Sequence, residues 1–270
     1  MNAFSVGPAL LFCPADRPER YAKALERSDA VIIDLEDAVR PEARPEARKA
    51  LVVSGLDPNR VVVRVNPLDS EDGAADLDAV ARTAYRTIMV AKSESPPRIA
   101  ELSDELAVIA LCETARGVVE AERIAALDNV IALMWGAEDL VASLGGSSSR
   151  MPDGGYRDVA RAARSRVLIA AGAFGKAAVD TVHLDIADHE GLAREAEDAA
   201  AVGFAATACI HPDQVEIIRR AYRPDLALVE WARAVLVAAD RHDGVFAFEG
   251  QMVDEPVLRH ARAVLARSVD

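Results

Sequence analysis

The feature that most constrains the fold is a regular alternation of short apolar runs with longer amphipathic stretches rich in alanine, arginine and glutamate. Runs of this kind are typical of strands buried on both faces, and the stretches between them carry apolar residues at helical spacing. The runs cover residues 9–15, 30–37, 61–67, 87–94, 107–114, 130–139, 177–185 and 206–212. Repeated strand–helix units predict a parallel α/β sheet with right-handed crossovers, and eight of them predict a closed (β/α)8 barrel.

The alternative to a barrel is an open, doubly wound sheet. A dinucleotide-binding version of that fold would carry a GxGxxG motif after its first strand, and none follows residues 9–15. A length of 270 residues also suits one barrel domain.

The Gly/Ser-rich stretch 144–155 is either a mobile active-site loop or a long surface connection.

The chain continues beyond the eighth run. We predict that residues 1–222 form the barrel and that 223–270 form a C-terminal extension with two helices and a short segment between them. The extension either belongs to the same domain or packs on a neighbouring subunit.

The formal net charge of −13 argues against binding to nucleic acid or to an anionic membrane surface, but it leaves room for an anionic small molecule at a locally basic site. Cys13, Cys112 and Cys209 form no metal-binding pattern, so buried free thiols are expected. No signal peptide or apolar stretch long enough to span a membrane is evident. These features fit a cytoplasmic protein.

Polar residues, together with one glycine, lie at the carboxyl-terminal ends of seven of the eight runs or just beyond them. They are Asp34, Glu36 and Asp37; Arg64 and Asn66; Lys92 and Glu94; Glu113, Thr114 and Arg116; Gly136, Glu138 and Asp139; His183 and Asp185; and His211. In a barrel enzyme these strand ends converge on the active site. Crowded carboxylates repel one another, and a divalent cation with oxygen ligands relieves the repulsion. The pattern therefore favours Mg²⁺, bound by Glu138 or Asp139 among others.

A structural interpretation remains open for each residue taken alone. Acidic residues after strands also cap the helices that follow them. Single histidines such as His183 and His211 are more often hydrogen-bonded core residues than ligands. Asp254 precedes Pro256, and by its residues alone it is best explained as a helix N-cap.

Several segments together resemble the citrate lyase beta-subunit-like proteins, part of the HpcH/HpaI aldolase group that includes malyl-CoA and citramalyl-CoA lyases. The segments are LFCPADRPERYAKA, VIIDLEDAV, VVVRVN, ALCETARGV, MWGAEDL and FEGQMVDEPV, which occur in the family's order over nearly the whole chain. The resemblance implies a TIM barrel, Mg²⁺ dependence, cleavage or formation of a 3-hydroxyacyl-CoA thioester, a keto-acid co-product and a homotrimer.

The resemblance also implies roles for residues near the metal. Glu113 and Asp139 match the two Mg²⁺ ligands, which selects Asp139 over Glu138. Arg64 matches the arginine that holds the keto-acid carboxylate and the polarised carbonyl. The backbone of Gly136 and Ala137 matches the wall around that carboxylate.

Further roles concern the rest of the substrate. Phe12, Arg17 and Arg20 lie in the segment that matches the CoA-facing part of the family. Asp34, Glu36 and Asp37 match its DLED stretch, whose carboxylates support metal-bound water or the thioester end. Asp254 matches the general acid/base of the C-terminal lid, which reaches a neighbouring subunit's site, so the resemblance reverses the assignment of Asp254 as a cap.

Other functions are compatible with the same motifs. The scaffold could serve a metal-dependent pyruvate aldolase, a malate synthase-like malyl-CoA thioesterase, or a non-catalytic subunit that binds CoA esters. Classical citrate lyase beta subunits act within a complex, whereas the compact tail here favours a stand-alone enzyme. The acyl group stays open among malyl, citramalyl, citryl and 3-hydroxy-3-methylglutaryl, because these groups differ by little more than a methyl or a short arm.

Overall fold

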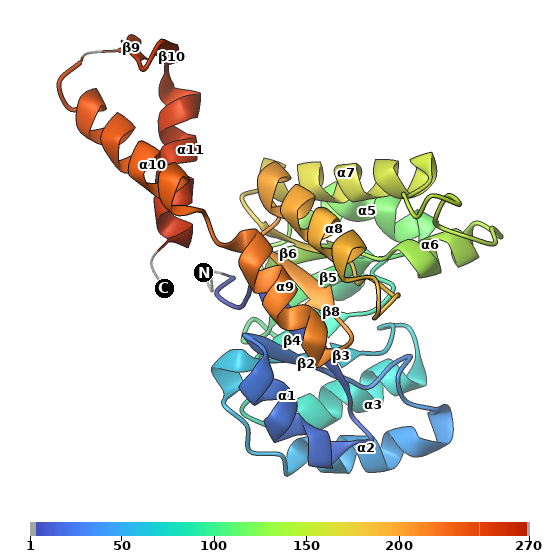
Figure 1. The fold of residues 1–270 in the computed structure, drawn as a ribbon. Coiled ribbons are helices and arrows are strands. Elements are labelled where there is room, and N and C mark those ends of the chain that lie inside the picture. The colour runs from blue at the N-terminus through green and yellow to red at the C-terminus, as the bar shows by residue number, and fades with distance from the viewer. Residues whose placement is uncertain (1–3, 243, 269–270) are drawn as a thin grey trace. The chain divides into compact units, whose positions relative to one another are not determined.

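The computed structural model describes residues 4–242 and 244–268, and its main feature is a closed barrel of eight parallel strands in chain order (Figure 1). The strands are β1 (Ala9–Pro14), β2 (Ala30–Asp34), β3 (Val61–Val65), β4 (Thr87–Val90), β5 (Ala107–Cys112), β6 (Val130–Trp135), β7 (Ala177–Asp180) and β8 (Ala206–Cys209). Parallel pairing of β8 with β1 closes the barrel, with Ala9 opposite Thr207. The predicted (β/α)8 fold is confirmed.

Each strand begins at the first residue of the corresponding apolar run and ends before the run does. The difference arises because the runs included polar residues that leave the sheet. β2, for example, ends at Asp34, and Glu36 already lies in the turn that follows. The strand ends thus place polar side chains at the carboxyl-terminal rim of the barrel.

Helices and short 3₁₀ turns connect the strands. The helices are α1 (Tyr21–Arg27), α2 (Arg44–Val52), α3 (Glu71–Val80), α4 (Pro96–Ala100), α5 (Ala115–Ala125), α6 (Ala137–Ser143), α7 (Asp158–Ala173), α8 (His189–Val202) and α9 (Pro212–Tyr222), and the turns are η1 (Pro18–Arg20), η2 (Pro41–Ala43) and η3 (Pro58–Arg60). Ser70, Thr114 and Asp188 cap α3, α5 and α8, each accepting a hydrogen bond from a glycine N–H three residues on. Such caps satisfy donors that the first helical turn leaves unpaired.

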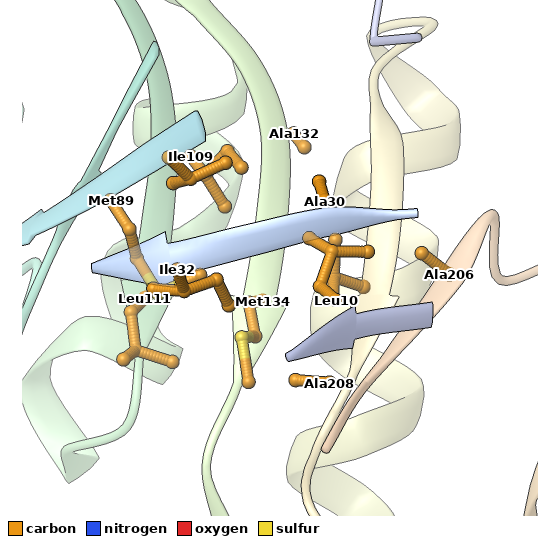
Figure 2. Close-up of a cluster of buried hydrophobic side chains, with 12 residues drawn as sticks. Leu10, Ala30, Ile32, Met89, Ile109, Leu111, Ala132, Met134, Ala206 and Ala208 are labelled. Atoms are coloured by element: carbon orange, nitrogen blue, oxygen red, sulfur yellow. The ribbon is translucent and has the colours of Figure 1, made fainter. Parts of the chain in front are cut away.

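Apolar side chains fill the interior of the barrel, as Figure 2 shows. Large residues such as Leu10, Ile32 and Ile109 meet small ones such as Ala132 and Ala208. Alternation of large and small residues allows the layers to interlock at the density of a protein core. The interior is therefore a packed core, and the functional groups must lie at the rim.

The three cysteines are buried free thiols, as expected. Burial raises the pKa of Cys112 to about 12 and that of Cys13 to about 11. Thiols with such pKa values carry little thiolate at neutral pH, so they are poor nucleophiles and poor metal ligands.

The chain divides into two compact units, Met1–Ile218 and Arg219–Asp270. The second contains α10 (Leu226–Ala239), the antiparallel strands β9 (Phe246–Phe248) and β10 (Gln251–Val253), and α11 (Glu255–Arg267). Val235, Phe246 and Val264 belong to its separate apolar core. Within the described residues, no helix is both long and apolar enough to cross a membrane.

Candidate active site

Arg64 and Asp34 form the most buried ion pair at the carboxyl-terminal rim. They are register partners on β3 and β2, and their side chains are 10% and 1% exposed. Arg64 Nε and Nη2 donate to the two oxygens of Asp34, each at 2.6 Å. The guanidinium also lies 4.9 Å from the centroid of the Phe12 ring on β1. Bidentate pairing and stacking fix the plane of the guanidinium.

The surroundings of this pair keep Arg64 charged. Burial opposes its charge, but Asp34 and Glu36 outweigh burial and raise the pKa of Arg64 above its ordinary value. Glu36 Oε2 lies 3.2 Å from Arg64 Nη1. An arginine has five N–H donors, so these two carboxylates do not exhaust them. Arg64 can therefore also donate to an anionic ligand at the rim.

Glu113 and Asp139 bring two carboxylates to neighbouring strand ends. Glu113 follows β5 directly and is 3% exposed, whereas Asp139 lies in the first turn of α6 and is partly exposed. Burial, followed by the negative charge of Asp139, raises the pKa of Glu113 to about 8. A cation bound beside Glu113 would favour the charged form of its carboxyl group.

Gly136 allows Glu113 to occupy its position. A Cβ atom at residue 136 would lie 2.8 Å from Glu113 Cβ and 3.0 Å from Glu113 Oε2. Such contacts are too short, so any larger residue would displace the carboxylate. Gly136 and the buried Ala137 join β6 to α6 and form a wall against Glu113. Their predicted place around the keto-acid carboxylate stays a prediction.

The donor set fits Mg²⁺. Among residues 4–242 and 244–268, no three histidine, cysteine or acidic side chains converge to hold a metal. A cation beside Glu113 and Asp139 would therefore take its other ligands from water or substrate oxygens. Mg²⁺ commonly binds through one or two carboxylates and keeps several waters, which matches this set.

Lys92 links the two groups of carboxylates, a role that the sequence did not reveal. Its ammonium is hydrogen-bonded to Glu36 and lies 3.4 Å from Asp37 Oδ2 and 3.6 Å from Asp139 Oδ1. Burial opposes the charge of Lys92, but Glu36 outweighs it and raises its pKa. The available signal was a basic residue after β4, whose neighbouring strand β5 is followed by the acidic Glu113.

Glu36 and Asp37 differ in their surroundings. Glu36 is 3% exposed, and burial raises its pKa, although Arg64 and Lys92 oppose the shift. The Asp37 side chain is 55% exposed and its backbone N–H donates to Glu36 Oε2 at 3.0 Å. Both predicted residues thus lie at the rim, one buried and one accessible to solvent.

The residues expected to face CoA lie beside β1. Phe12 packs on the barrel interior and against Arg64. Arg17 and Arg20 flank and end η1, and both are exposed. Their position leaves two cationic side chains accessible to an anionic ligand. Their contact with CoA stays a prediction.

Asp254 lies in the second compact unit, where it caps α11. Its Oδ1 accepts a hydrogen bond from Val257 N at 3.3 Å. The capping role expected from the residues alone is therefore present. Its role as an acid or base stays a prediction.

Three further polar residues of the predicted set have partners away from the carboxylate pair. Glu138 accepts a hydrogen bond from Ser149 Oγ. His183 is buried, and its Nδ1 lies 2.8 Å from Glu195 Oε2, as expected of a hydrogen-bonded core histidine. His211 Nδ1 accepts from Asp213 N. Asp139, rather than Glu138, is the residue close to Lys92.

Comparison with known proteins shows the family. The model of the HpcH/HpaI aldolase/citrate lyase family matches residues 9–212. A citrate lyase subunit beta-like protein of Mycobacterium tuberculosis is 58% identical over 268 residues, which cover 99% of this chain and 98% of that protein. A (3S)-malyl-CoA thioesterase of Cereibacter sphaeroides is 33% identical over 272 residues, which cover 96% and 94%.

A solved structure extends the similarity to three dimensions. It is the crystal structure of protein CitE from Mycobacterium tuberculosis in complex with magnesium, acetoacetate and coenzyme A. It is 57% identical, covers 98% of this chain and 99% of its own, and has a TM-score of 0.93. The strand-end carboxylates and the buried arginine agree with these matches. The family match and the 58% identity show that the chain belongs to the HpcH/HpaI aldolase/citrate lyase family.

Proposed function

We propose that this protein is a Mg²⁺-dependent carbon–carbon lyase that cleaves or forms a 3-hydroxyacyl-CoA thioester, with an acyl-CoA and a keto acid as the other reactants. The observation that carries the proposal is the juxtaposition of the fixed Arg64 guanidinium with the Glu113–Asp139 pair at one rim of the barrel. The guanidinium suits a carboxylate and an oxyanion, and the pair of carboxylates suits a divalent cation.

Arg64 would bind the keto-acid end of the substrate. Asp34 holds two of its N–H groups and Glu36 lies near a third, so the guanidinium keeps one orientation and would still have donors for a ligand. Fixed positive charge stabilises an oxygen that gains negative charge in the transition state. Arg64→Ala should therefore weaken both substrate binding and turnover.

Glu113 and Asp139 would hold the metal ion. Mg²⁺ in this position would supply Lewis-acid polarisation of the substrate's hydroxyl or keto oxygen. Gly136 keeps the Glu113 carboxylate in place, and Lys92 N–H donates to Glu113 Oε1 at 3.1 Å. These contacts set the direction of the Glu113 carboxylate before any ligand arrives.

Asp254 would serve as the base, from the second compact unit. In cleavage it takes the proton of the 3-hydroxyl group as the carbon–carbon bond breaks. The hydroxyl-bearing carbon becomes the carbonyl of the keto acid, and the electron pair passes to the thioester as an enolate. A proton returned to the enolate carbon completes the acyl-CoA. General acid/base catalysis of this kind contributes a factor of about 10² to 10⁴.

The relatives support the substrate class. The solved structure that is 57% identical holds magnesium, acetoacetate, which is a keto acid, and coenzyme A. The exposed Arg17 and Arg20 beside β1 suit the phosphates of such a carrier. The homotrimer implied by the resemblance is part of the proposal, because it would bring Asp254 of one subunit to the site of its neighbour.

Mass spectrometry of acyl-CoA products tests the proposal. Purified protein is incubated with malyl-, citramalyl-, citryl- and 3-hydroxy-3-methylglutaryl-CoA, with Mg²⁺ or with EDTA. We expect one thioester to give an acyl-CoA and a keto acid, and EDTA to stop the reaction. If no thioester is cleaved although calorimetry detects Mg²⁺ binding, the lyase assignment is wrong.

A thioesterase is the second candidate, favoured by the 33% identity to a (3S)-malyl-CoA thioesterase. Hydrolysis would release free CoA and a hydroxy acid with its carbon chain intact. The same assay separates the two reactions, because only a lyase shortens the acyl chain. Free CoA as the sole thiol product would favour the thioesterase.

A further inference from the structure

Lys92 has an unusual backbone conformation for its residue type. Its φ angle is 48°, in the left-handed region, and among the described non-glycine residues only Glu249 shares a positive φ. Such conformations are strained for residues with a side chain and persist where the surroundings enforce them, often at functional sites. Lys92 follows β4 by two residues, at the rim of the barrel.

Contacts from three directions hold Lys92 in this conformation. Its backbone N–H donates to Glu113 Oε1 at 3.1 Å. Its ammonium contacts Glu36 and Asp37 from the loop after β2, and Asp139 from α6. One residue thus touches both proposed metal ligands, with the backbone on one and the side chain near the other.

The side chain of Lys92 places a cation where the site would otherwise hold uncompensated negative charge. Glu36 is almost fully buried, and Arg64 and Lys92 are its positively charged partners. At 3.6 Å from Asp139 Oδ1, the ammonium already neutralises part of the charge that would attract a metal ion.

We propose that Lys92 is an internal counter-cation that stabilises the carboxylate cluster in the metal-free protein and lowers its affinity for Mg²⁺ by electrostatic competition. The inference rests on the proposed function, because it takes Glu113 and Asp139 as the metal ligands. Lys92 acts through these carboxylates and is a positioning residue. It need not touch the substrate.

The expected change in Mg²⁺ affinity follows from the contacts that hold Glu113 and Asp139 in place. Glu113 is held by a backbone N–H and by the wall at Gly136, neither of which depends on the ammonium. Asp139 is carried by α6. Removing the ammonium therefore leaves the ligands in place and removes a positive charge. We expect Mg²⁺ affinity to rise, whereas a purely structural role would make it fall or leave it unchanged.

Calorimetric titration with Mg²⁺ alone tests the inference on the full chain. We expect Lys92→Met to bind Mg²⁺ roughly tenfold more tightly than the unchanged protein. Its Tm without metal should be lower, and Mg²⁺ should raise it by more than in the unchanged protein. Lys92→Arg keeps the charge and should keep the affinity near its original value.

Lys176→Met is the matched control. Lys176 is partly buried just before β7, at the opposite end of the barrel, and its ammonium donates to Leu127 O. The same substitution there removes an equal charge and should not alter Mg²⁺ affinity. Lys92→Gly is a second variant that removes the ammonium and also relieves the positive φ, so it should fold even if Lys92→Met does not.

The outcomes are distinct. Tighter binding by Lys92→Met or Lys92→Gly, with Lys176→Met unchanged, supports the inference. Unchanged or weaker binding by the Lys92 variants, with normal binding by the unchanged protein, overturns the inference alone. Absence of Mg²⁺ binding by the unchanged protein overturns both the inference and the metal dependence of the proposed function.

Discussion

Gly136 is a residue of the candidate site with no room for a larger side chain. It has a negative φ, so the requirement for glycine comes from space and not from backbone conformation. The nearest atoms to a Cβ there belong to Glu113, at 2.8 and 3.0 Å. The ends of the neighbouring strands β5 and β6 therefore pack closely against each other at the proposed metal site.

We predict that Gly136→Ala weakens Mg²⁺ binding at least tenfold. The added methyl group must push the Glu113 carboxylate away, and a displaced ligand binds the metal poorly. Calorimetry with Mg²⁺ measures the effect.

Gly172→Ala in α7 is the control, because a Cβ there has no atom within 4 Å in the described structure. It should leave binding unchanged and stabilise the helix by up to about 1 kcal/mol. Equal binding by both variants would contradict the prediction.

The choice between Glu138 and Asp139 shows why part of the site could not be derived from the residues alone. Successive residues in a helix point in directions about 100° apart. Which of two adjacent acids faces the barrel axis depends on how α6 leaves β6, a geometric property that the pattern does not contain. The structure directs Asp139 toward Lys92 and Glu138 toward Ser149. The resemblance had selected the same residue.

Asp34→Asn tests the buried ion pair. Asp34 accepts two hydrogen bonds from Arg64 and two more from backbone N–H groups, at Glu36 and Ala38. The amide of asparagine cannot accept all four, and it leaves the buried guanidinium without its main counter-charge. Breaking such a pair costs roughly 3 kcal/mol of unfolding free energy.

Urea denaturation measures this cost. Asp57→Asn is the control for Asp34→Asn, since Asp57 is exposed and caps η3, a role that asparagine also fills. Its unfolding free energy should stay within about 0.5 kcal/mol of the original value. A loss of similar size in both variants would show that the ion pair contributes little.

At the scale of elements, the strands were predictable and their contacts with one another were not. Runs of apolar residues located the start of each strand because buried strands of a parallel barrel need apolar side chains on both faces. The position of Lys92 among four carboxylates depends on the irregular loops after β2 and β4 and on the directions in which the chain leaves β5 and β6. Such loop geometry has no periodic signal in a sequence.

An ion-pair cluster joins α2 to α3 on the outside of the barrel. Arg44 and Arg48 of α2 are hydrogen-bonded to Asp72, and Arg48 Nε donates to Asp76 Oδ1 at 2.6 Å. The bond from Arg48 is the main cause of a lowered pKa at Asp72. A carboxyl whose pKa is lower in the folded protein stabilises the fold above its unfolded pKa, and this contribution is lost as the pH falls through the folded value.

We therefore predict a pH-dependent effect of Asp72→Asn. At pH 7 the variant should be less stable than the unchanged protein. The difference should shrink as the pH falls below about 4, the ordinary pKa of an aspartate, because protonation then removes the same charge. Urea unfolding midpoints at several pH values measure this difference in stability between the two proteins. Asp78→Asn, at an exposed position of α3, should show no such convergence. A difference that is constant with pH would contradict the prediction.

At the scale of the whole molecule, the chain separates a barrel from a small helical unit with its own apolar core. The residues predicted both helices of the second unit, which the structure gives as Leu226–Ala239 and Glu255–Arg267. They could not predict whether Asp254 acts in chemistry, because its sequence context is that of an ordinary N-cap. Its role in the reaction therefore stays a proposal.

Asp254→Asn separates the two roles of this residue. Asparagine is an N-cap as good as aspartate, so the stability of α11 should not change. It cannot take a proton, so turnover of the cleaved thioester should fall by a factor of about 10² to 10⁴. Thermal unfolding and steady-state kinetics on the full chain measure the two quantities.

The matched control for Asp254→Asn lies in the same unit. Asp225 caps α10 and accepts a hydrogen bond from Leu228 N at 2.7 Å. Asp225→Asn makes the same chemical change at the other cap, and it should leave both stability and turnover intact. If Asp254→Asn also retains full turnover, Asp254 is only a cap and the base must come from another carboxylate, with the solvent-accessible Asp37 as the first to test. If turnover falls only in Asp254→Asn, the second unit supplies a reacting group, and the barrel alone is an incomplete enzyme.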